Sequence, residues 1–363
     1  MSKLRVGLLF GGRSVEHEVS IASAASIFRA LDPTRYEVHL VAVDPQGRWH
    51  LAPAVPAPQL AISGQEVRLP AVPGRAALVP VSAGDSRKIA ELDVVFPIVH
   101  GRGGEDGSLQ GLLDLADVPY VGSGVLGSAL QMDKEVSKRL LRAAGLPVLP
   151  FVCVHAAALA RDPHGEARRV TDALDFPIFV KPANLGSSVG IHKVKDASAL
   201  LPALRDAARY DTKILVEQGI PARDVEIALL GRDPVEASVP GEIRTRREWY
   251  DYEAKYVDED TELLVPAPVS EELAAKLRDA AIAAFHALEG DGIARVDFLV
   301  HRDTGEFYVN ELNSLPGFTE VSMYPRMWEA SGLPYPALLD RLIELALERH
   351  RERARLETQY KRS

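Results

Sequence analysis

The stretch LRVGLLFGGRSVEHEVS, residues 4–20, decides the fold class of this chain. Residues 4–10 are a short apolar run that ends at two glycines, and apolar residues then recur at helical spacing over 19–31. Further strand-like runs follow at 36–43 and 93–99. Strands that alternate with helices predict an N-terminal α/β domain built on a mostly parallel sheet.

The remainder of the chain predicts more strands and helices. Residues 45–80 hold seven prolines, which excludes a long helix there and predicts an insertion of short extended pieces. An Ala-rich amphipathic helix is expected over 271–288, with Ser270 as its N-cap. Other helices are expected at 132–144 and 338–356, and strands at 148–154, 177–181, 213–217, 225–230, 293–300 and 307–312.

Composition bounds the class of protein. The chain has 363 residues, which corresponds to about two or three domains. Hydrophobic residues make up 47% and charged residues 26%, as in soluble globular proteins, so wholesale disorder is excluded. The net charge of −9 argues against a general nucleic-acid binder, which needs a basic surface.

Cysteine usage and hydropathy indicate the compartment. The single cysteine, Cys153, cannot form an intramolecular disulfide, which favours a reducing compartment. The apolar run at 4–10 is too short for a signal peptide. The longest uncharged stretch, 143–160, contains Gly145, Pro147 and Pro150, so no membrane helix is expected. We therefore expect a cytoplasmic protein with neither a membrane nor a nucleic acid as partner.

Two glycine clusters follow predicted strands. Gly11 and Gly12 allow close approach of the backbone to a ligand, although an ordinary strand–helix turn explains them equally well. They form no GxGxxG, so a dinucleotide-binding motif is not supported. The segment HGRGGEDGSLQG, residues 100–111, has five glycines interleaved with charged residues. Its place at a strand end is where ligands bind in parallel sheets.

A third cluster has the composition of a phosphate-binding loop. The segment KPANLGSSVG, residues 181–190, combines a strand-end lysine with small residues and two hydroxyls. Backbone N–H groups and hydroxyls there can surround a phosphate that the lysine neutralises. The order differs from a P-loop, and a glycine-rich hairpin is the alternative.

A fourth cluster predicts a metal site. Arg295, Val296 and Asp297 lie on one expected strand, and Glu311 and Asn313 lie two residues apart on the next, so their side chains share a strand face. Two carboxylates and an amide oxygen suit Mg²⁺, whose coordination phosphate oxygens would complete. Surface charge on an edge strand is the alternative, which the apolar flanking residues disfavour.

Together these segments resemble the D-alanine–D-alanine ligase family of the ATP-grasp superfamily over residues 5–342. HGRGGEDGSLQG and ARVDFLV…NELNSLPG resemble its two signatures, KPANLGSSVG its phosphate loop, and WYDYEAKY its active-site loop. The resemblance implies α/β and α+β domains in an ATP-grasp fold: an N-terminal parallel-sheet domain, 1–122, and two lobes that grip ATP, 123–217 and 218–363. It also implies a loop over the site at about 241–263, and a homodimer.

The resemblance further implies the reaction. ATP phosphorylates the carboxylate of one D-alanine, and the amine of a second attacks the acyl phosphate to give D-alanyl-D-alanine, a peptidoglycan precursor. The implied cofactors are ATP and Mg²⁺, for which Mn²⁺ can substitute. A D-alanine–D-lactate or D-alanine–D-serine ligase on the same scaffold is the alternative. A catalytically inactive ATP-binding regulator is disfavoured because every charged position of the metal and phosphate sites is filled.

Residue roles are implied position by position. Catalytic roles fall to Glu16, Ser187, Tyr256, Arg295, Gly317 and Ser322. Substrate contacts fall to Glu16, His100, Lys255, Ser322 and Met323. ATP contacts fall to Lys134, Lys181, Ser187, Ser188, Glu217, Gln218, Ile220 and Asp224, and metal contacts to Asp297, Glu311 and Asn313.

Two of these positions have particular consequences. The family usually has Glu where this chain has Asp224, opposite the ATP ribose, and Glu226 shares its strand face and is an alternative ligand. Ligases of the family that prefer D-alanine carry Tyr at the position of Tyr256, whereas relatives that make the D-lactate ester carry Phe or a different loop. Tyr256 therefore predicts D-alanine as the acceptor.

Overall fold

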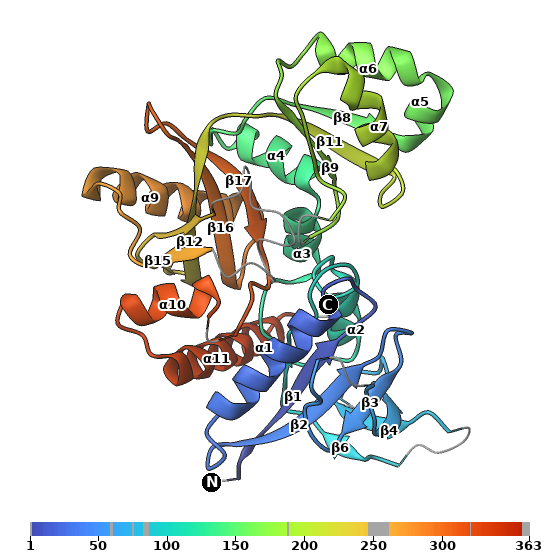
Figure 1. Ribbon diagram of the computed structural model, residues 1–363. Helices are drawn as coiled ribbons and strands as arrows, with labels where there is room; N and C mark the ends of the chain where they lie inside the picture. Colours follow the sequence, from blue (N-terminus) through green and yellow to red (C-terminus); the bar gives the residue numbers. More distant parts are fainter. Residues whose placement is uncertain are drawn as a thin grey trace, which may run out of the picture.

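The computed structural model describes residues 2–58, 61–74, 76–82, 87–186, 189–245, 261–319 and 321–357. Within these ranges the chain forms three sheets of seven, four and six strands, which follow one another along the sequence (Figure 1). The α/β class expected for the N-terminal part is confirmed, and the two later sheets, with helices packed against them, are α+β. No helix in the described part of the chain is long and apolar enough to cross a membrane.

The N-terminal sheet is parallel only at one end. Strand β1 (Leu4–Gly11) pairs in parallel with β2 (Tyr36–Val43) and β7 (Val94–Pro97), and α1 (His17–Ala30) follows β1. The proline-rich segment supplies the strands that pair antiparallel beyond β2: β3 (Trp49–Ala52), β4 (Gln65–Arg68), β5 (Ala77–Pro80) and β6 (Ala90–Glu91). The expectation of a mostly parallel sheet is therefore wrong for the strands from β3 to β6, which all pair antiparallel. Three of the four connections from β2 to β6 are shorter than the dozen residues that a parallel crossover requires.

The central sheet is antiparallel and has a core of its own. It consists of β8 (Phe151–His155), β9 (Ile178–Pro182), β10 (His192–Val194) and β11 (Lys213–Gln218), in the order β10-β9-β11-β8. Helices α5 (Ala156–Arg161), α6 (Pro163–Thr171) and α7 (Ala197–Ala207) lie beside it at the top of Figure 1. Val154, Val180, Leu204 and Ile214 are fully buried in this core.

The C-terminal sheet is covered on both faces. Its path runs β15 (Glu262–Leu264), β14 (Gly241–Arg244), β12 (Ala222–Gly231), β16 (Gly292–His301) and β17 (Phe307–Asn313), and β13 (Val235–Ala237) also pairs with β12. Alternate residues of β12 face α9 (Glu271–Ala287) on one side and α10 (Met323–Ala330) with α11 (Tyr335–Arg353) on the other. Ser270 is the N-cap of α9, as expected, and its Oγ accepts from the Leu273 N–H at 3.2 Å.

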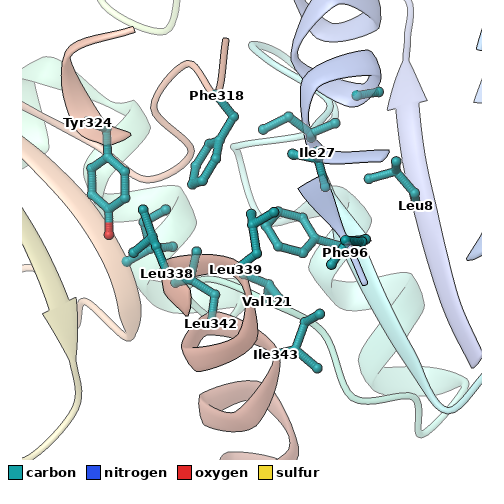
Figure 2. Close-up of a cluster of buried hydrophobic side chains, with 14 of the residues drawn as sticks. Leu8, Ile27, Phe96, Val121, Phe318, Tyr324, Leu338, Leu339, Leu342 and Ile343 are labelled. Carbon is teal, nitrogen blue, oxygen red and sulfur yellow. The ribbon is translucent and has the colours of Figure 1, made fainter. Parts of the chain in front are cut away.

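The N-terminal and C-terminal parts share one hydrophobic core. Leu8, Ile27 and Phe96 from the N-terminal sheet and α1 pack with Phe318, Tyr324 and the buried face of α11 (Figure 2). The Phe96 and Phe318 rings meet edge to face with centroids 5.9 Å apart. Because this core is continuous, the N-terminal and C-terminal parts are held together more extensively than either is held to the central sheet.

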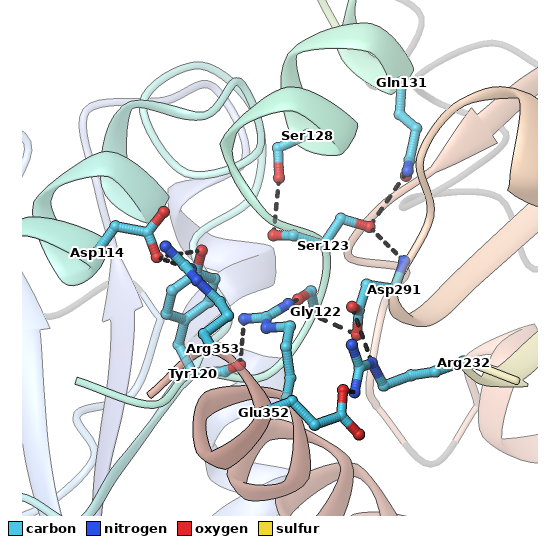
Figure 3. A network of polar contacts seen from close by, with 11 residues as sticks. Asp114, Tyr120, Gly122, Ser123, Ser128, Gln131, Arg232, Asp291, Glu352 and Arg353 are labelled. Atoms are coloured by element: carbon cyan, nitrogen blue, oxygen red, sulfur yellow. Dashed lines mark hydrogen bonds and ion pairs between the residues drawn. The ribbon is translucent and has the colours of Figure 1, made fainter. Parts of the chain in front are cut away.

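Polar contacts join the same two parts at the segment 120–124 (Figure 3). Arg349 of α11 donates to the carbonyls of Gly122 and, at 2.9 Å, Tyr120. Ser123 Oγ accepts from the Asp291 N–H at 3.1 Å and from Gln131 at 3.2 Å. These contacts fix the chain where α2 (Ser108–Leu115) gives way to α3 (Val125–Met132) and α4 (Lys134–Ala143).

Candidate active site

A cavity of about 470 Å³ lies between the central and C-terminal sheets. This volume lies within the range of small-molecule sites. Strands β9 and β11 form one wall, and β12, β16 and β17 form the other. Nine of the residues predicted from the sequence line it: Lys134, Lys181, Glu217, Gln218, Ile220, Asp224, Arg295, Asp297 and Glu311.

Lys134 is held at one edge of the cavity by the start of α4. Asp133 caps this helix by accepting the backbone N–H groups of Glu135 and Val136 at 3.2 and 3.0 Å. The Lys134 ammonium then donates to the Leu185 carbonyl at 3.0 Å and forms an ion pair with Glu311 Oε2, also at 3.0 Å. Lys134 therefore connects the glycine-rich loop after β9 to β17.

A buried carboxylate lies between two lysines at the back of the cavity. Glu217 Oε2 is 2.8 Å from Lys181 Nζ, and Glu217 Oε1 is 2.5 Å from Lys138 Nζ. Burial alone would raise the pKa of Glu217, but the two ammonium groups outweigh it and lower that pKa. Lys181 keeps 11% of its side chain exposed, whereas Lys138 keeps 2%. Lys181 thus presents positive charge to the cavity.

The predicted metal ligands converge on neighbouring strands. Asp297 lies opposite Glu311, and Arg295 lies opposite Asn313, in the antiparallel pair of β16 and β17. Arg295 binds both oxygens of Asp297 at 2.7 Å, and Asn313 Nδ2 donates to Asp297 Oδ2 at 2.9 Å. Two carboxylates and one amide therefore lie within one small polar cluster, which agrees with the donor set expected for a hard divalent cation.

An irregularity in β17 brings one more polar side chain to the cavity. The register shifts between Asp297 and Phe298, so that Asn310 is inserted between residues paired with them. Bulges of this kind redirect side chains beside active sites. Asn310 and Glu311 both line the cavity, and Asn310 Oδ1 accepts from Lys181 Nζ at 3.5 Å.

Asp224 and Glu226, the two alternatives opposite the ribose, lie in different surroundings. Glu226 is 4% exposed, lies opposite Asp297 in the sheet and is 3.2 Å from the Arg295 guanidinium. Asp224 lies two residues nearer the start of β12, on the same cavity wall. Glu226 is therefore engaged by Arg295 deep in the site, and both acids lie on the wall of the cavity.

A second polar cluster surrounds Glu16 beside the cavity. A Cβ atom placed on Gly186 or Gly101 would lie 2.9 or 2.7 Å from Glu16 Oε2, so both glycines leave room for this carboxylate. Gly11, by contrast, is required for packing of the strand, because a Cβ there would lie 2.3 Å from the Val43 carbonyl oxygen. Glu16 therefore lies against the glycine-rich loop at 185–186 and against the start of the segment 100–111.

His100, which is buried, and Glu105, which is half-buried, complete this cluster. His100 Nδ1 lies 3.1 Å from the Leu315 carbonyl oxygen, and burial lowers the pKa of His100. Glu105 accepts the Leu315 N–H at 3.2 Å and the Gly101 N–H at 2.5 Å. Burial, and then the charge of Glu16, raise the pKa of Glu105 to about 8. His100 is therefore neutral at neutral pH.

The two residues predicted at the second-substrate site differ in what they offer. Ser322 Oγ accepts from the Thr319 N–H at 3.0 Å, and a Cβ on Gly317 would lie 3.0 Å from it, so Gly317 and Ser322 are adjacent. The side chain of Met323 is 5% exposed and belongs to the shared core. Met323 therefore has only its backbone to present to a substrate.

The predicted adenine-binding segment is anchored from behind. The Gln218 side chain donates to the Asp175 carbonyl at 2.7 Å and accepts from the Asp175 N–H at 3.0 Å. Its amide group thus holds the loop before β9, and the cavity is bordered here by the segment from Glu217 to Ile220.

Four predicted residues lie outside the described part of the chain: Ser187, Ser188, Lys255 and Tyr256. The loop expected over 241–263 is shorter than predicted at both ends, because β14 and β15 pair with Ile243 opposite Leu263. The interior of that segment, 246–260, lies outside the described residues.

Among the polar side chains in and behind this site, Lys138, Glu105 and Asn310 have no role assigned from the sequence. Lys138 follows Lys134 by four residues, a spacing that places two side chains on one helix face. That spacing was a usable signal. Glu105 and Asn310 acquire their surroundings from Leu315 and from the bulge, which no local pattern indicates.

Two family models and several curated relatives match most of this chain. A family model described as D-ala D-ala ligase N-terminus matches residues 5–123, and one described as D-ala D-ala ligase C-terminus matches residues 140–344. The chain is 51% identical over 370 residues to the D-alanine–D-alanine ligase A of Bradyrhizobium diazoefficiens, with 99% of each chain covered. It is 49% identical over 359 residues to that of Chromobacterium violaceum, with 97% of each covered.

Solved structures with the same fold include two ligases. The D-alanine–D-alanine ligase from Coxiella burnetii has a TM-score of 0.83 and 38% identity, covering 98% of this chain and 97% of its own. The VanG D-Ala:D-Ser ligase from Enterococcus faecalis has a TM-score of 0.83 and 30% identity, covering 95% and 100%.

Proposed function

Because the chain belongs to the D-alanine–D-alanine ligase family, we propose that the cavity between its central and C-terminal sheets binds ATP and that the cluster around Glu16 binds the first D-alanine. The enzyme joins two D-alanines with ATP to give D-alanyl-D-alanine for peptidoglycan synthesis. The observation that carries the site assignment is the cavity itself, which gathers Lys134, Lys181 and two of the predicted metal ligands, Asp297 and Glu311, on facing walls.

The chemistry proceeds in two transfers. A carboxylate oxygen of the first D-alanine attacks the γ-phosphorus of ATP, and ADP leaves. The amine of the second D-alanine, after losing a proton, attacks the carbonyl carbon of the acyl phosphate, and inorganic phosphate leaves. Phosphorylation makes the carboxylate oxygen a good leaving group, so the enzyme mainly positions reactants and stabilises charge.

Lys134 and Lys181 are the proposed ligands of the ATP phosphates. Both ammonium groups border the cavity, one at each end of the glycine-rich segment 181–186. Asp224 accepts from the ribose hydroxyls, and the backbone from Glu217 to Ile220 borders the adenine. Ser187 and Ser188 complete the phosphate loop in this proposal.

A divalent metal accompanies ATP in this family, and we assign it to Asp297, Glu311 and Asn313 as Mg²⁺, with Mn²⁺ able to substitute. These side chains supply the hard oxygen donors that such a cation requires. Arg295 and the Asn313 amide now donate to Asp297, and Lys134 is paired with Glu311. A bound cation would take over part of these contacts. When bound, the metal neutralises phosphate charge during transfer.

Arg295 and the N–H of Gly317 are the proposed donors to the oxyanion of the tetrahedral intermediate. Arg295 is half-buried and oriented by Asp297 and Glu226, so it needs little reorganisation. Glu16 pairs with the ammonium of the first D-alanine, beside His100, which is neutral and adds no competing charge. The Ser322 hydroxyl and the Met323 backbone hold the carboxylate of the second D-alanine.

Four further proposals concern a lid, the domain boundaries, the oligomeric state and the cellular location. We propose a lid within 241–263 that excludes water from the acyl phosphate, with Lys255 on it and Tyr256 hydrogen-bonded to Ser187 and Glu16. We propose domains at 1–122, 123–217 and 218–363. The separate core of the central sheet supports the middle one. We also propose a homodimer and a cytoplasmic location, which agrees with the site of peptidoglycan precursor synthesis.

Titration of ATP into single variants tests the nucleotide site. Lys181→Met and Asp224→Ala should each weaken ATP binding, and Lys276→Met, which alters an exposed lysine of α9 outside the cavity, should not. The loss for Lys181 should be about tenfold to a hundredfold, the range of a charged hydrogen-bond partner. Unchanged ATP affinity in both cavity variants would refute this location for the nucleotide.

A further inference from the structure

Lys138 is a buried cation that the reaction as described does not use. It lies one helical turn after Lys134 on α4, but unlike Lys134 it is not among the residues that border the cavity. Its side chain is 2% exposed, and Lys138 is one of the largest fully buried side chains in the described chain. A buried ammonium is costly unless it is paired, so its partner indicates its role.

That partner is Glu217, which Lys138 shares with Lys181. The two lysines bind opposite oxygens of one carboxylate, Lys138 at 2.5 Å and Lys181 at 2.8 Å. Lys138 also donates to the Val309 carbonyl of β17 at 3.4 Å. Glu217 is itself 1% exposed. The cluster of Lys138, Glu217 and Lys181 thus spans α4, β9 and β11 and contacts β17 behind the cavity.

The charges of this cluster do not cancel. Burial lowers the pKa of Lys138, but its 2.5 Å contact with Glu217 favours the ammonium form. Two ammonium groups and one carboxylate leave one net positive charge, and of the two lysines only Lys181 borders the cavity. Without Lys138 the full negative charge of Glu217 would face Lys181, and the cluster would be neutral. The electrostatic attraction for a phosphate group would then fall sharply in this low-dielectric site.

We propose that Lys138 is a positioning residue that neutralises Glu217, so that the charge of Lys181 is available to the phosphates of ATP. This inference rests on the proposed nucleotide site, because it gives Lys138 a function only if Lys181 contacts ATP. Lys138 itself touches no substrate. It acts through Glu217, and the effect is one of charge rather than of shape.

Charge rescue tests this proposal. Lys138→Met should weaken ATP binding about tenfold to a hundredfold, the range of a charged hydrogen-bond partner. The double variant Lys138→Met/Glu217→Gln restores one net charge on Lys181 and should recover most of that affinity. Adenosine has no phosphate, so its affinity should change little in either variant. ATP and adenosine affinities are measured by calorimetric titration of the full-length protein, with melting temperatures recorded for each variant.

The possible outcomes distinguish failure of the role proposed for Lys138 from failure of the proposed ATP site. If Lys181→Met weakens ATP binding but Glu217→Gln fails to rescue Lys138→Met, the role of Lys138 is structural and this inference is wrong. Equal losses for ATP and adenosine would contradict it in the same way. If Lys181→Met alone leaves ATP affinity unchanged, Lys181 does not contact the phosphates and this inference is wrong. If Asp224→Ala also leaves it unchanged, the nucleotide site itself is wrong. Should Lys138→Met fold poorly, Lys138→Gln keeps a hydrogen-bond donor to Glu217 without the charge, and the same loss and rescue are expected.

Discussion

Asp297 lies directly opposite Glu311 in the antiparallel pair of β16 and β17, and both side chains border the same cavity. Each carboxylate is neutralised by a cation from its surroundings, Asp297 by Arg295 and Glu311 by Lys134. Two acids so close together are unfavourable unless cations hold them. This pairing is the basis for the metal assignment and for the first prediction.

Glu311→Gln should abolish ligation and leave the fold intact. The substitution keeps the volume of the side chain but removes one charged metal ligand and the partner of Lys134. Ligase activity should fall by at least about a hundredfold, since ligand charge contributes to both metal and phosphate binding. Product formation and the circular dichroism spectrum are measured together. Glu306→Gln, at an exposed position beside β17, is the matched control, and near-normal turnover of Glu311→Gln would contradict the metal assignment.

Glu105→Gln should remove a pH dependence of stability. The folded-state pKa of Glu105 is raised to about 8 from 4.5 by burial and by the charge of Glu16. The folded protein therefore holds a proton there that the unfolded chain releases, and its stability falls as pH rises from 4.5 to 8. The variant lacks this loss of stability. The melting temperature of the variant minus that of the parent should therefore increase by about 3 °C or more between pH 5 and pH 8. Parallel curves for the two proteins would show that Glu105 is ionised in the folded state.

Phe318→Ala should destabilise the core that the N-terminal and C-terminal parts share. Phe318 is fully buried and contacts Phe96 across that core, with centroids 5.9 Å apart. The free energy of unfolding should fall by about 3–5 kcal/mol, as for other buried aromatic truncations. Urea denaturation measures it, with the 69% exposed Val321, replaced by Ala, as the control. A loss no larger than that of the control would mean that the two parts do not depend on this contact.

Tyr256→Phe should let the enzyme form more D-alanyl-D-lactate at low pH. The phenol is proposed to hydrogen-bond to Ser187 and Glu16, and loss of that bond costs about 1–3 kcal/mol, or tenfold to a hundredfold in rate. D-Alanine must also lose a proton before it attacks, so D-lactate competes best at low pH. Competition between D-alanine and D-lactate from pH 6 to 9 measures this. A parent enzyme that makes mainly the ester at every pH would refute the role given to Tyr256.

The lid should be detectable by hydrogen exchange. Exchange within 246–260 should slow when ATP and a phosphinate analogue of the intermediate are bound together, because closure protects backbone amides. Helix α9, which lies outside the cavity, provides an internal reference whose exchange should not change. Identical exchange in this segment with and without ligands would remove the lid from the account.

Local patterns in the sequence predicted much of this site. The two-residue spacing of Glu311 and Asn313 predicts that their side chains share one strand face beside the strand of Asp297, because the side-chain period of a strand is two. That Asp297 lies directly opposite Glu311 depends on the bulge at Asn310, and no spacing rule predicts this bulge. The surroundings of Glu105 come from Leu315, 210 residues away along the chain. Such contacts depend on tertiary structure and are invisible to a local reading.

The same limit applies to one feature of the fold and to one residue of the site. The prolines of 45–80 predicted short extended pieces, but not that these would extend the N-terminal sheet in the antiparallel direction. The resemblance places Met323 at the second-substrate site, and the folded chain adds that its side chain belongs to the shared core. The Met323 side chain lies against Gly241 of β14, where a Cβ atom would come 2.3 Å from Met323 Cε, and no local pattern indicates this contact.

The most direct test of the central claim is a product analysis under competition. The protein is incubated with ATP, Mg²⁺ and equal concentrations of D-alanine, D-serine and D-lactate at neutral pH, and the products are separated by mass. We predict D-alanyl-D-alanine as the main product, with one ADP and one phosphate released for each dipeptide and none without D-alanine. A main product ending in D-serine or D-lactate, or ADP release that does not depend on D-alanine, would contradict the account.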